Sequence, residues 1–205
     1  MTKIKFCGLR REQDIKWANE IRPDYAGMVF VPKSKRYVTI EQAARLRSML
    51  DPGITAVGVF VNEAPEAAAS VAEQGIIDVI QLHGQEDEEY IQKLRSLTNC
   101  PVFQAFRMDG PEDAARANRS SADMVLLDAG SGGTGTVFDW NLLESVYRPY
   151  ILAGGLNLEN AEQAVRRWKP WGVDVSSGIE TEGIKDREKM ADFARRVRGV
   201  NNNDE

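Results

Sequence analysis

Tyr150-Ile151-Leu152-Ala153-Gly154-Gly155-Leu156-Asn157 contains the pattern on which our fold prediction rests. A short apolar run comes first, and it has no alternating polar positions of the kind that a sheet with one solvent-exposed face requires. A glycine pair then permits a tight turn, and Asn157 is a residue type suited to begin a helix. The stretch is therefore typical of a buried parallel strand that leads into a helix.

Seven further runs share this character, and charged amphipathic segments lie between them. Alternation of strands and helices predicts a parallel sheet, and eight uninterrupted units predict its closure into a (β/α)8 barrel, or TIM barrel. An open Rossmann-type sheet would need a GxGxxG turn after its first strand, which Cys7-Gly8-Leu9-Arg10 does not provide. We expect one compact barrel domain with few insertions over residues 1–199 and a polar tail over residues 200–205. The other runs are Ile4–Cys7, Tyr25–Val31, Ala56–Val61, Ile76–Leu82, Val102–Phe106, Met124–Leu127 and Gly172–Val175.

Helix-start signals stand between several of these runs. They are a Thr39–Gln42 capping box, Pro111 at a first helical position, and N-cap candidates Asp139, Asn157 and Asp186.

Composition and charge exclude several classes of protein. The 205 residues include 26 basic and 31 acidic side chains, and the net charge of −5 argues against a nucleic-acid partner. Two cysteines cannot form a disulfide scaffold, and a single histidine leaves no histidine-pair metal motif. The stretch Lys3–Cys7 does not have the pattern expected of a signal peptide, and the longest apolar stretch, around Ala56–Val61, is far below the ~18 residues of a membrane span. We expect a cytoplasmic protein without membrane contact; monomer and homodimer both stay open.

In a barrel of this kind the active site lies at the carboxyl ends of the strands. Two of the last loops are typical of a phosphate site: glycines let the backbone approach an anion, and hydroxyl and amide groups donate hydrogen bonds to it. The alternative is that the glycine pair serves only a tight turn; the presence of both loops favours phosphate. The candidates are Gly154 and Gly155 after the seventh run, with Ser176, Ser177 and Gly178 after the eighth.

Four other strand-end residues have both a functional and a plain structural interpretation. Cys7 is a reactive thiol or a buried filler, and Asp128 is an acid with apolar walls or a turn aspartate. His83 is a site residue or a partner of its own loop, and it is a poor metal ligand without a second histidine. Arg36 binds an anion or is a solvated charge beside Lys33 and Lys35.

The strand-end motifs, in their order along the chain, resemble the phosphoribosylanthranilate isomerase family. The resemblance extends from residue 3 to about residue 186. It is carried by Lys5-Phe6-Cys7-Gly8-Leu9, Gly58–Asn62, Gln81–Gly84, Leu127-Asp128, Gly132–Gly135 with Phe138–Trp140, Leu152–Leu156 and Val173–Glu180.

The resemblance implies an Amadori rearrangement of a phosphosugar in tryptophan biosynthesis, without metal or redox cofactor. It implies that Cys7 is the general base at C2′ and that Asp128 is the general acid at the ring oxygen. Arg36 would hold the anthranilate carboxylate. Gly155 and Ser177, with their neighbours, would bind the phosphate, and Asp174 and His83 would lie near the sugar. How the Cys7 thiolate forms stays open at this stage.

Two departures from the family pattern stand out. Arg10 replaces a small threonine-like residue, and Ala129-Gly130-Ser131 shortens the loop after the sixth run, which puts lid closure in question.

Three other functions are alternatives to this one. A metal-dependent pentulose-phosphate epimerase would need more histidines, and a thiamine-phosphate-type synthase is a further phosphosugar alternative. A non-catalytic phosphate-binding barrel would need neither Cys7 nor Asp128.

Overall fold

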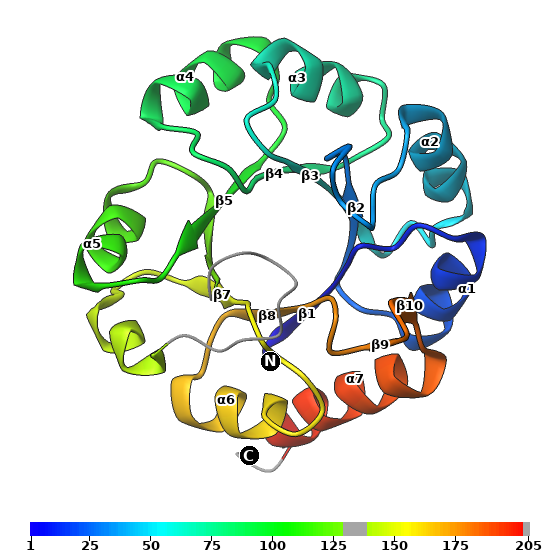
Figure 1. The fold of residues 1–205 in the computed structure, drawn as a ribbon, viewed down its shortest axis with the longest axis vertical. Helices are drawn as coiled ribbons and strands as arrows, with labels where there is room; N and C mark the ends of the chain where they lie inside the picture. Colours follow the sequence, from blue (N-terminus) through cyan, green and yellow to red (C-terminus); the bar gives the residue numbers. More distant parts are fainter. Residues whose placement is uncertain (129–138, 203–205) are drawn as a thin grey trace.

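The strands form a closed parallel barrel in a computed structural model that describes residues 1–128 and 139–202. Strands β1 to β8 follow one another around the barrel in chain order, and β8 pairs with β1 to close it (Figure 1). The predicted (β/α)8 barrel is therefore confirmed, with each strand lying on a predicted run. The strands are β1 Lys3–Cys7, β2 Tyr25–Val29, β3 Thr55–Phe60, β4 Val79–Leu82, β5 Val102–Arg107, β6 Met124–Asp128, β7 Tyr150–Leu152 and β8 Gly172–Val175.

Helices cover the outside of the barrel (Figure 1). Between β6 and β7 the described residues form a short 3-10 helix, η1, in place of an α-helix. The elements are α1 Glu12–Ile21, α2 Ile40–Met49, α3 Pro65–Glu73, α4 Glu88–Leu97, α5 Pro111–Arg119, η1 Trp140–Ser145, α6 Ala161–Trp168 and α7 Arg187–Asn202. No helix among the described residues is both long enough and apolar enough to cross a membrane.

Most of the predicted helix starts are confirmed. Pro111 begins α5, and the carboxylates of Asp139 and Asp186 accept backbone N–H groups at the starts of η1 and α7. Thr39 accepts from the Gln42 backbone, but the Gln42 side chain donates to the Arg10 carbonyl oxygen, so only half of the predicted capping box forms.

The prediction for Asn157 is wrong. Its Oδ1 accepts the N–H groups of Glu159 and Asn160 and closes a turn, so α6 begins only at Ala161, with Asn160 at the cap.

Alternation along each strand divides the apolar side chains into two layers. On β1, Ile4 and Phe6 point outward and belong to the large cluster between strands and helices. Lys5 and Cys7, which alternate with them, therefore point into the barrel. The barrel interior is otherwise filled by a separate apolar cluster: Val57, Val79, Phe103, Met124, Leu126, Ile151 and Ala153.

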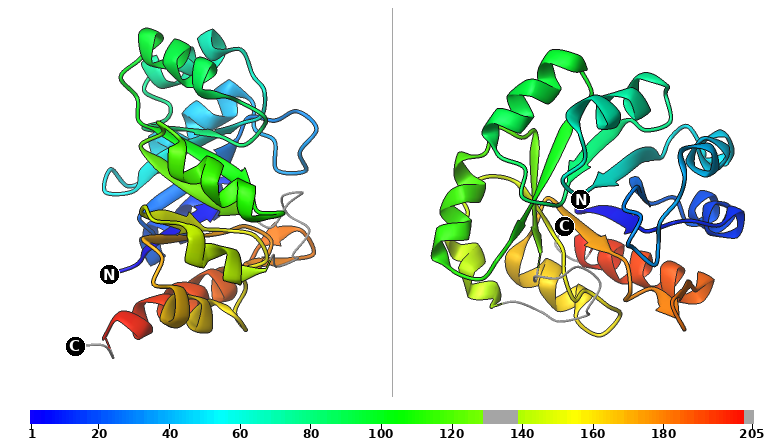
Figure 2. Two further views of the ribbon diagram at one scale, coloured as in Figure 1. Left: turned by 90° about the vertical axis from the view of Figure 1, so that its left-hand side faces the viewer. Right: turned by 45° about the horizontal axis from the view of Figure 1, so that its top comes forward.

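A small antiparallel hairpin follows β8 and was not predicted. It consists of β9 Glu180–Thr181 and β10 Ile184–Lys185, joined by a two-residue turn with positive φ at both positions. The hairpin lies beside α1 and α7 at the mouth of the barrel, whereas both chain termini lie on the opposite face (Figures 1 and 2).

The last helix extends further than expected. Helix α7 includes Val200 to Asn202, and Val200 is buried in the outer apolar layer. Regular structure therefore continues beyond residue 199, where we placed the end of the barrel domain.

The loops after β7 and β8 are pressed together at one glycine. Gly178 forms an isolated parallel bridge with Asn157. A Cβ atom added at Gly178 would lie only 2.0 Å from the Leu156 carbonyl oxygen. Since that contact is to backbone, relief requires movement of a whole loop.

We expect Gly178→Ala to lower the free energy of unfolding by roughly 2 kcal/mol or more, because overpacking against backbone cannot relax through a side chain. The matched control is Gly199→Ala in α7, where an added Cβ meets nothing within 4 Å. This control should raise stability by about 0.5–1 kcal/mol, since glycine is a poor helix former. Urea unfolding measures the stability of both variants. Equal midpoints for the two variants would contradict the close contact between Gly178 and the Leu156 carbonyl oxygen.

Candidate active site

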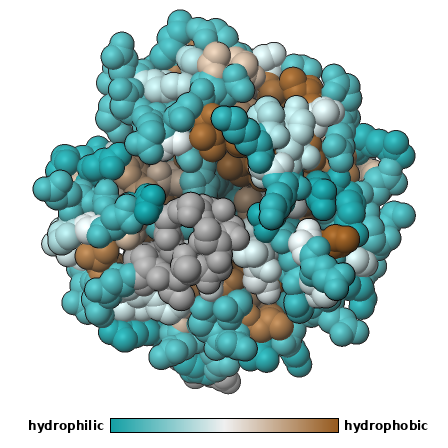
Figure 3. Space-filling model, viewed as in Figure 1, coloured by the Kyte–Doolittle hydropathy of each residue, from teal (hydrophilic) through white to brown (hydrophobic). Residues whose placement is uncertain are grey.

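A pocket of about 260 Å³ lies at the carboxyl ends of the strands. The view into the mouth shows a hollow near the middle of this face, with apolar side chains inside it (Figure 3). Nine of the ten predicted site residues line the pocket: Cys7, Arg36, His83, Asp128, Gly154, Gly155, Asp174, Ser176 and Ser177. Gly178 does not line it, and acts instead by holding the two last loops together. The structure therefore brings the predicted residues to one place; their individual roles stay predictions.

Cys7 lies at the end of β1 in an apolar corner of the pocket. Its side chain packs with Val29 of β2 and Val59 of β3. Burial raises the pKa of the Cys7 thiol, and the nearby Lys5 ammonium opposes that rise. The thiol is free, as is that of Cys100.

Asp128 lies at the end of β6 and contacts a residue that sequence reasoning placed near the sugar. Its Oδ2 is 2.9 Å from Nε2 of His83, whose Nδ1 is 3.4 Å from Nε2 of Gln81. Because the Gln81 amide nitrogen can only donate, Nδ1 accepts, and Nε2–H of His83 donates to the carboxylate. His83 thus holds the Asp128 carboxyl in a fixed direction, and its local contact with Gln81 accounts for only one of its two ring nitrogens.

Asp174 also has a partner that the sequence interpretation missed. Its Oδ1 is 3.0 Å from Nζ of Lys5, and both side chains are buried. The two residues face each other in register across β1 and β8. The inward alternation of Lys5 and Cys7 on one short strand was the signal that could have revealed this pair.

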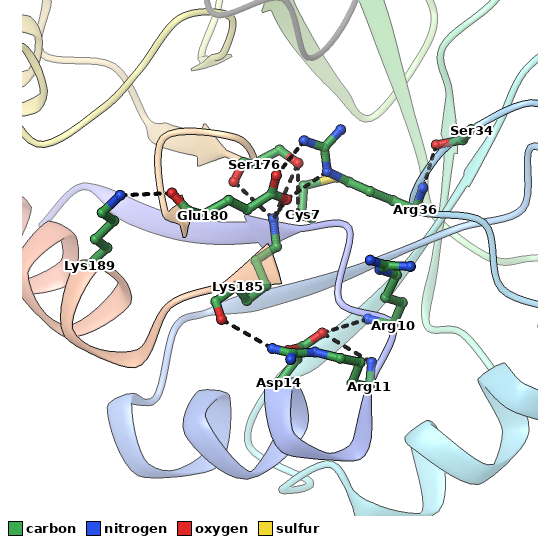
Figure 4. Close-up of polar contacts among 10 residues, drawn as sticks. All are labelled: Cys7, Arg10, Arg11, Asp14, Ser34, Arg36, Ser176, Glu180, Lys185 and Lys189. Atoms are coloured by element: carbon green, nitrogen blue, oxygen red, sulfur yellow. Dashed lines mark hydrogen bonds and ion pairs between the residues drawn. The ribbon is translucent and has the colours of Figure 1, made fainter. Parts of the chain in front are cut away.

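Arg36 is held from the side by the hairpin. Its Nε and Nη2 donate to the two carboxylate oxygens of Glu180, each at 2.7 Å (Figure 4). Nζ of the buried Lys185 donates to the same carboxylate at 2.6 Å and to the Ser176 carbonyl at 2.8 Å. Arg36 therefore belongs to an ion-pair network with Glu180 and Lys185, and its interpretation as a solvated surface charge is wrong.

The same network reaches the first strand. Ser176 Oγ donates to the Cys7 carbonyl oxygen at 3.0 Å, so the loop after β8 is tied to the strand that carries the thiol (Figure 4). Arg11, held by Asp14 at the start of α1, donates to the Lys185 carbonyl. Glu180 and Lys185 were missed because no apolar pattern marks a two-residue strand; only the Glu182-Gly183 turn signals the hairpin.

The loops after β7 and β8 provide the groups expected of a phosphate site. Gly154 and Gly155 adopt φ angles of 74° and 69°, a left-handed conformation that favours glycine and turns the backbone toward the pocket. The hydroxyl groups of Ser176 and Ser177 lie on the facing loop. Because α6 begins at Ala161, these loops rather than its first turn line the pocket.

Arg10 and the short segment after β6 are the two departures from the family pattern. The Arg10 backbone is anchored by Asp14 and Gln42, and its side chain does not line the pocket. The short segment 129–131 and the Gly132–Gly135 motif lie outside the described residues.

Among residues 1–128 and 139–202, no group of three histidine, cysteine, aspartate or glutamate side chains could hold a metal ion.

A lower pH should weaken the ion pair between Glu180 and Arg36. Burial opposes ionisation of Glu180, but the hydrogen bonds from Arg36 and the charge of Lys185 outweigh it and lower the pKa of the carboxyl. A depressed folded-state pKa contributes stability above the unfolded-state value, and that stability is lost as the pH falls through the folded-state value.

We expect Glu180→Gln to destabilise the protein at pH 7 by roughly 2 kcal/mol, since a buried charge-assisted bond is lost. The gap between the wild type and the variant should narrow as the pH falls below about 4, near the carboxyl's ordinary pKa. Thermal unfolding across pH measures this, with the exposed Glu112→Gln as the control. A gap that stays constant with pH would contradict the role of the carboxylate charge.

Comparisons with known proteins agree with the site. A sequence model of the family described as N-(5'phosphoribosyl)anthranilate (PRA) isomerase matches residues 4–196. The N-(5'-phosphoribosyl)anthranilate isomerase of Thermoanaerobacter sp. (strain X514) is 46% identical over 206 residues, which cover 98% of this chain and 100% of the relative. The enzyme of the same name from Clostridium acetobutylicum is 44% identical, covering 97% of this chain and 98% of its own.

Solved structures lead to the same family. The phosphoribosyl anthranilate isomerase of Thermotoga maritima superimposes with a TM-score of 0.88 at 37% identity, over 97% of this chain and 100% of that one. A phosphoribosyl anthranilate isomerase in complex with reduced 1-(o-carboxyphenylamino)-1-deoxyribulose 5-phosphate does so with a TM-score of 0.86 at 36% identity, with the same coverage. With the barrel, the pocket and these matches in agreement, the chain belongs to the phosphoribosylanthranilate isomerase family.

Proposed function

We propose that the protein catalyses the Amadori rearrangement of N-(5'-phosphoribosyl)anthranilate to 1-(2-carboxyphenylamino)-1-deoxyribulose 5-phosphate in tryptophan biosynthesis. One observation carries the proposal: a single pocket contains a thiol on β1 and a carboxyl on β6, with an arginine and two loops that contain glycine and serine around them. An aldose-to-ketose rearrangement needs one acid and one base beside a small sugar, and this pocket offers both.

Asp128 is the proposed acid. As a protonated carboxyl it would deliver its proton to the furanose ring oxygen, so that the C1–O bond breaks and an iminium forms between C1 and the anthranilate nitrogen. The hydrogen bond from His83 keeps the carboxyl directed across the mouth. This bond also stabilises the carboxylate that remains after the proton has left.

Cys7 is the proposed base. Its thiolate would remove the proton from C2′ of the open-chain iminium, which gives an enolamine that tautomerises to the aminoketone. Val29 and Val59 pack beside the thiol, and their apolar side chains would limit the access of water to this position. Exclusion of water strengthens the electrostatic interactions of the developing charges.

Arg36 is the proposed anchor for the anthranilate carboxylate. Glu180 occupies the edge of the guanidinium formed by Nε and Nη2. The edge formed by Nη1 and Nη2 is then oriented for a second carboxylate, which it can bind through two parallel hydrogen bonds. At the other end of the substrate, the loops with Gly154, Gly155, Ser176 and Ser177 would hold the phosphate and so position the sugar between Cys7 and Asp128.

We further propose that the enzyme works in the cytoplasm as a monomer or a homodimer. A base that is a free thiol is preserved in a reducing compartment. One solved relative, 36% identical, is described as mutually generated monomers of a dimeric phosphoribosylanthranilate isomerase from Thermotoga maritima. Light scattering of the purified protein would detect either state, and a larger assembly would contradict the proposal.

The isomerase assay tests the function directly. Purified protein with freshly made N-(5'-phosphoribosyl)anthranilate should form the deoxyribulose product, and a chelator should leave the rate unchanged. Cys7→Ala and Asp128→Asn should each lower kcat by at least about 100-fold, the typical contribution of one acid or base, while the reduced product analogue still binds. The analogous aminoaldose of histidine biosynthesis is the parallel substrate. Turnover of that compound alone, or binding of the analogue without any turnover, would contradict the proposal.

Arg36→Met should act mainly on binding. Loss of a bidentate carboxylate contact should raise KM about 10-fold or more with a smaller effect on kcat. The matched control is Lys35→Met, one residue earlier in the same loop and outside the pocket lining. Equal KM values for the two variants would remove Arg36 from the anthranilate site.

A further inference from the structure

The position of Cys7 raises a question about its charge. A base must be deprotonated, but burial among apolar side chains favours the neutral thiol. At its ordinary pKa of about 8.5 a thiol is only a few per cent ionised at neutral pH, and burial reduces that fraction. A cation close to the sulfur would favour the thiolate that Cys7 needs in order to act as the base.

Lys5 is placed to supply this cation. It precedes Cys7 by two residues on β1, so both side chains point into the barrel, and Lys5 is 1% exposed. A Cβ atom built on Gly27 of β2 would lie 3.1 Å from Nζ of Lys5 and 3.0 Å from Sγ of Cys7. The ammonium and the sulfur thus converge on one small space, which exists because residue 27 has no side chain.

Asp174 maintains the charge of Lys5. Burial alone would favour the neutral amine, but the carboxylate 3.0 Å away, together with the Cys7 sulfur, outweighs that effect, and the pKa of Lys5 is raised. The ammonium has three hydrogens, and the bond to Asp174 uses one of them. Lys5 therefore remains a cation that can also donate to the sulfur.

The charged groups that face Cys7 come from four segments. Lys5 lies on β1, Asp174 on β8, Lys185 on β10, and Arg36 on the loop after β2. Burial lowers the pKa of Lys185, and its Nζ is bound to Glu180 and the Ser176 carbonyl, so it serves the hairpin. Arg36 is likewise paired with Glu180. Lys5 is the cation that shares both strand and direction with the thiol.

We propose that Lys5 is a positioning residue that stabilises the Cys7 thiolate, with Asp174 holding its ammonium in place and Gly27 providing the space. The inference rests on the proposed role of Cys7 as the base. It assigns Asp174 a function through Lys5, in addition to any contact with the sugar. Three charged groups thus interact in the barrel interior: the Asp174 carboxylate, the Lys5 ammonium and the Cys7 thiolate.

The test titrates the thiol itself rather than turnover. In a Cys100→Ser background Cys7 is the only thiol of the chain, and the pH dependence of its alkylation by iodoacetamide gives its apparent pKa. Lys5→Met, which replaces the ammonium with an uncharged side chain of similar length, should raise that pKa by at least about one unit, a 10-fold loss of thiolate. Lys5→Arg should restore most of it. The acid limb of the kcat/KM profile should move by the same amount.

The matched control is Lys3→Met on the same strand. Lys3 also pairs with an aspartate, Asp24, but it is exposed at the other end of β1. Its loss should leave the thiol titration unchanged. If Lys5→Met does not fold because Asp174 is left unpaired, the Lys5→Met/Asp174→Asn double variant removes that carboxylate. Because the Asp174 charge by itself raises the pKa of Cys7, the double variant is compared with Asp174→Asn alone, above which its thiol pKa should lie, with folding checked by circular dichroism.

The outcomes separate this inference from the proposed function. An active isomerase whose thiol titrates alike in wild type and Lys5→Met would overturn the role of Lys5 and leave the function intact. A protein without isomerase activity whose thiol still shifts would overturn the function while the electrostatic coupling stands.

Discussion

The ion pair between Lys5 and Asp174 lies at the seam where the first and last strands meet. A parallel barrel closes only if β8 pairs with β1 in one register, and a shift by one residue would turn every inward side chain of one strand outward. Two buried charges that face each other across that seam penalise any such shift, because each would lose its partner in an apolar interior. The pair at this seam also lies next to the thiol on the same strand, so one contact contributes both to the register of closure and to the electrostatics of the site.

Above this seam, the mouth is organised by carboxylates that each serve more than one partner. Glu180 joins Arg36 of the loop after β2 to Lys185 of the hairpin. On the far side, Glu86 accepts the backbone N–H groups of Asn62 and Gly84, and so joins the loops after β3 and β4. Two of these contacts, Arg36 with Glu180 and Asn62 with Glu86, join loops that are distant in the sequence. They hold the rim in a single arrangement that the strands alone would not determine.

The strands and the strand-end residues could be predicted because barrel geometry turns sequence order into spatial order. Buried parallel strands are recognisable as apolar runs, and the carboxyl end of each run marks the mouth. The partners of the site residues could not be predicted in the same way. The bonds from His83 to Asp128 and from Arg36 to Glu180 join residues 45 and 144 positions apart, and no local pattern records such distances. The helix start predicted at Asn157 was wrong because of a local bond rather than a distant one. The Asn157 side chain closes its own turn, and this turn competes with the helix start that an asparagine favours.

The close fit of Gly178 against the Leu156 carbonyl has a further meaning for ligand binding. Two loops that touch backbone to backbone cannot fluctuate independently, so the groups proposed to bind the phosphate are already arranged before a ligand arrives. Little conformational entropy is then lost when a phosphate is bound. More of the interaction energy of the phosphate remains for orienting the rest of the molecule, which lies several bonds away from it.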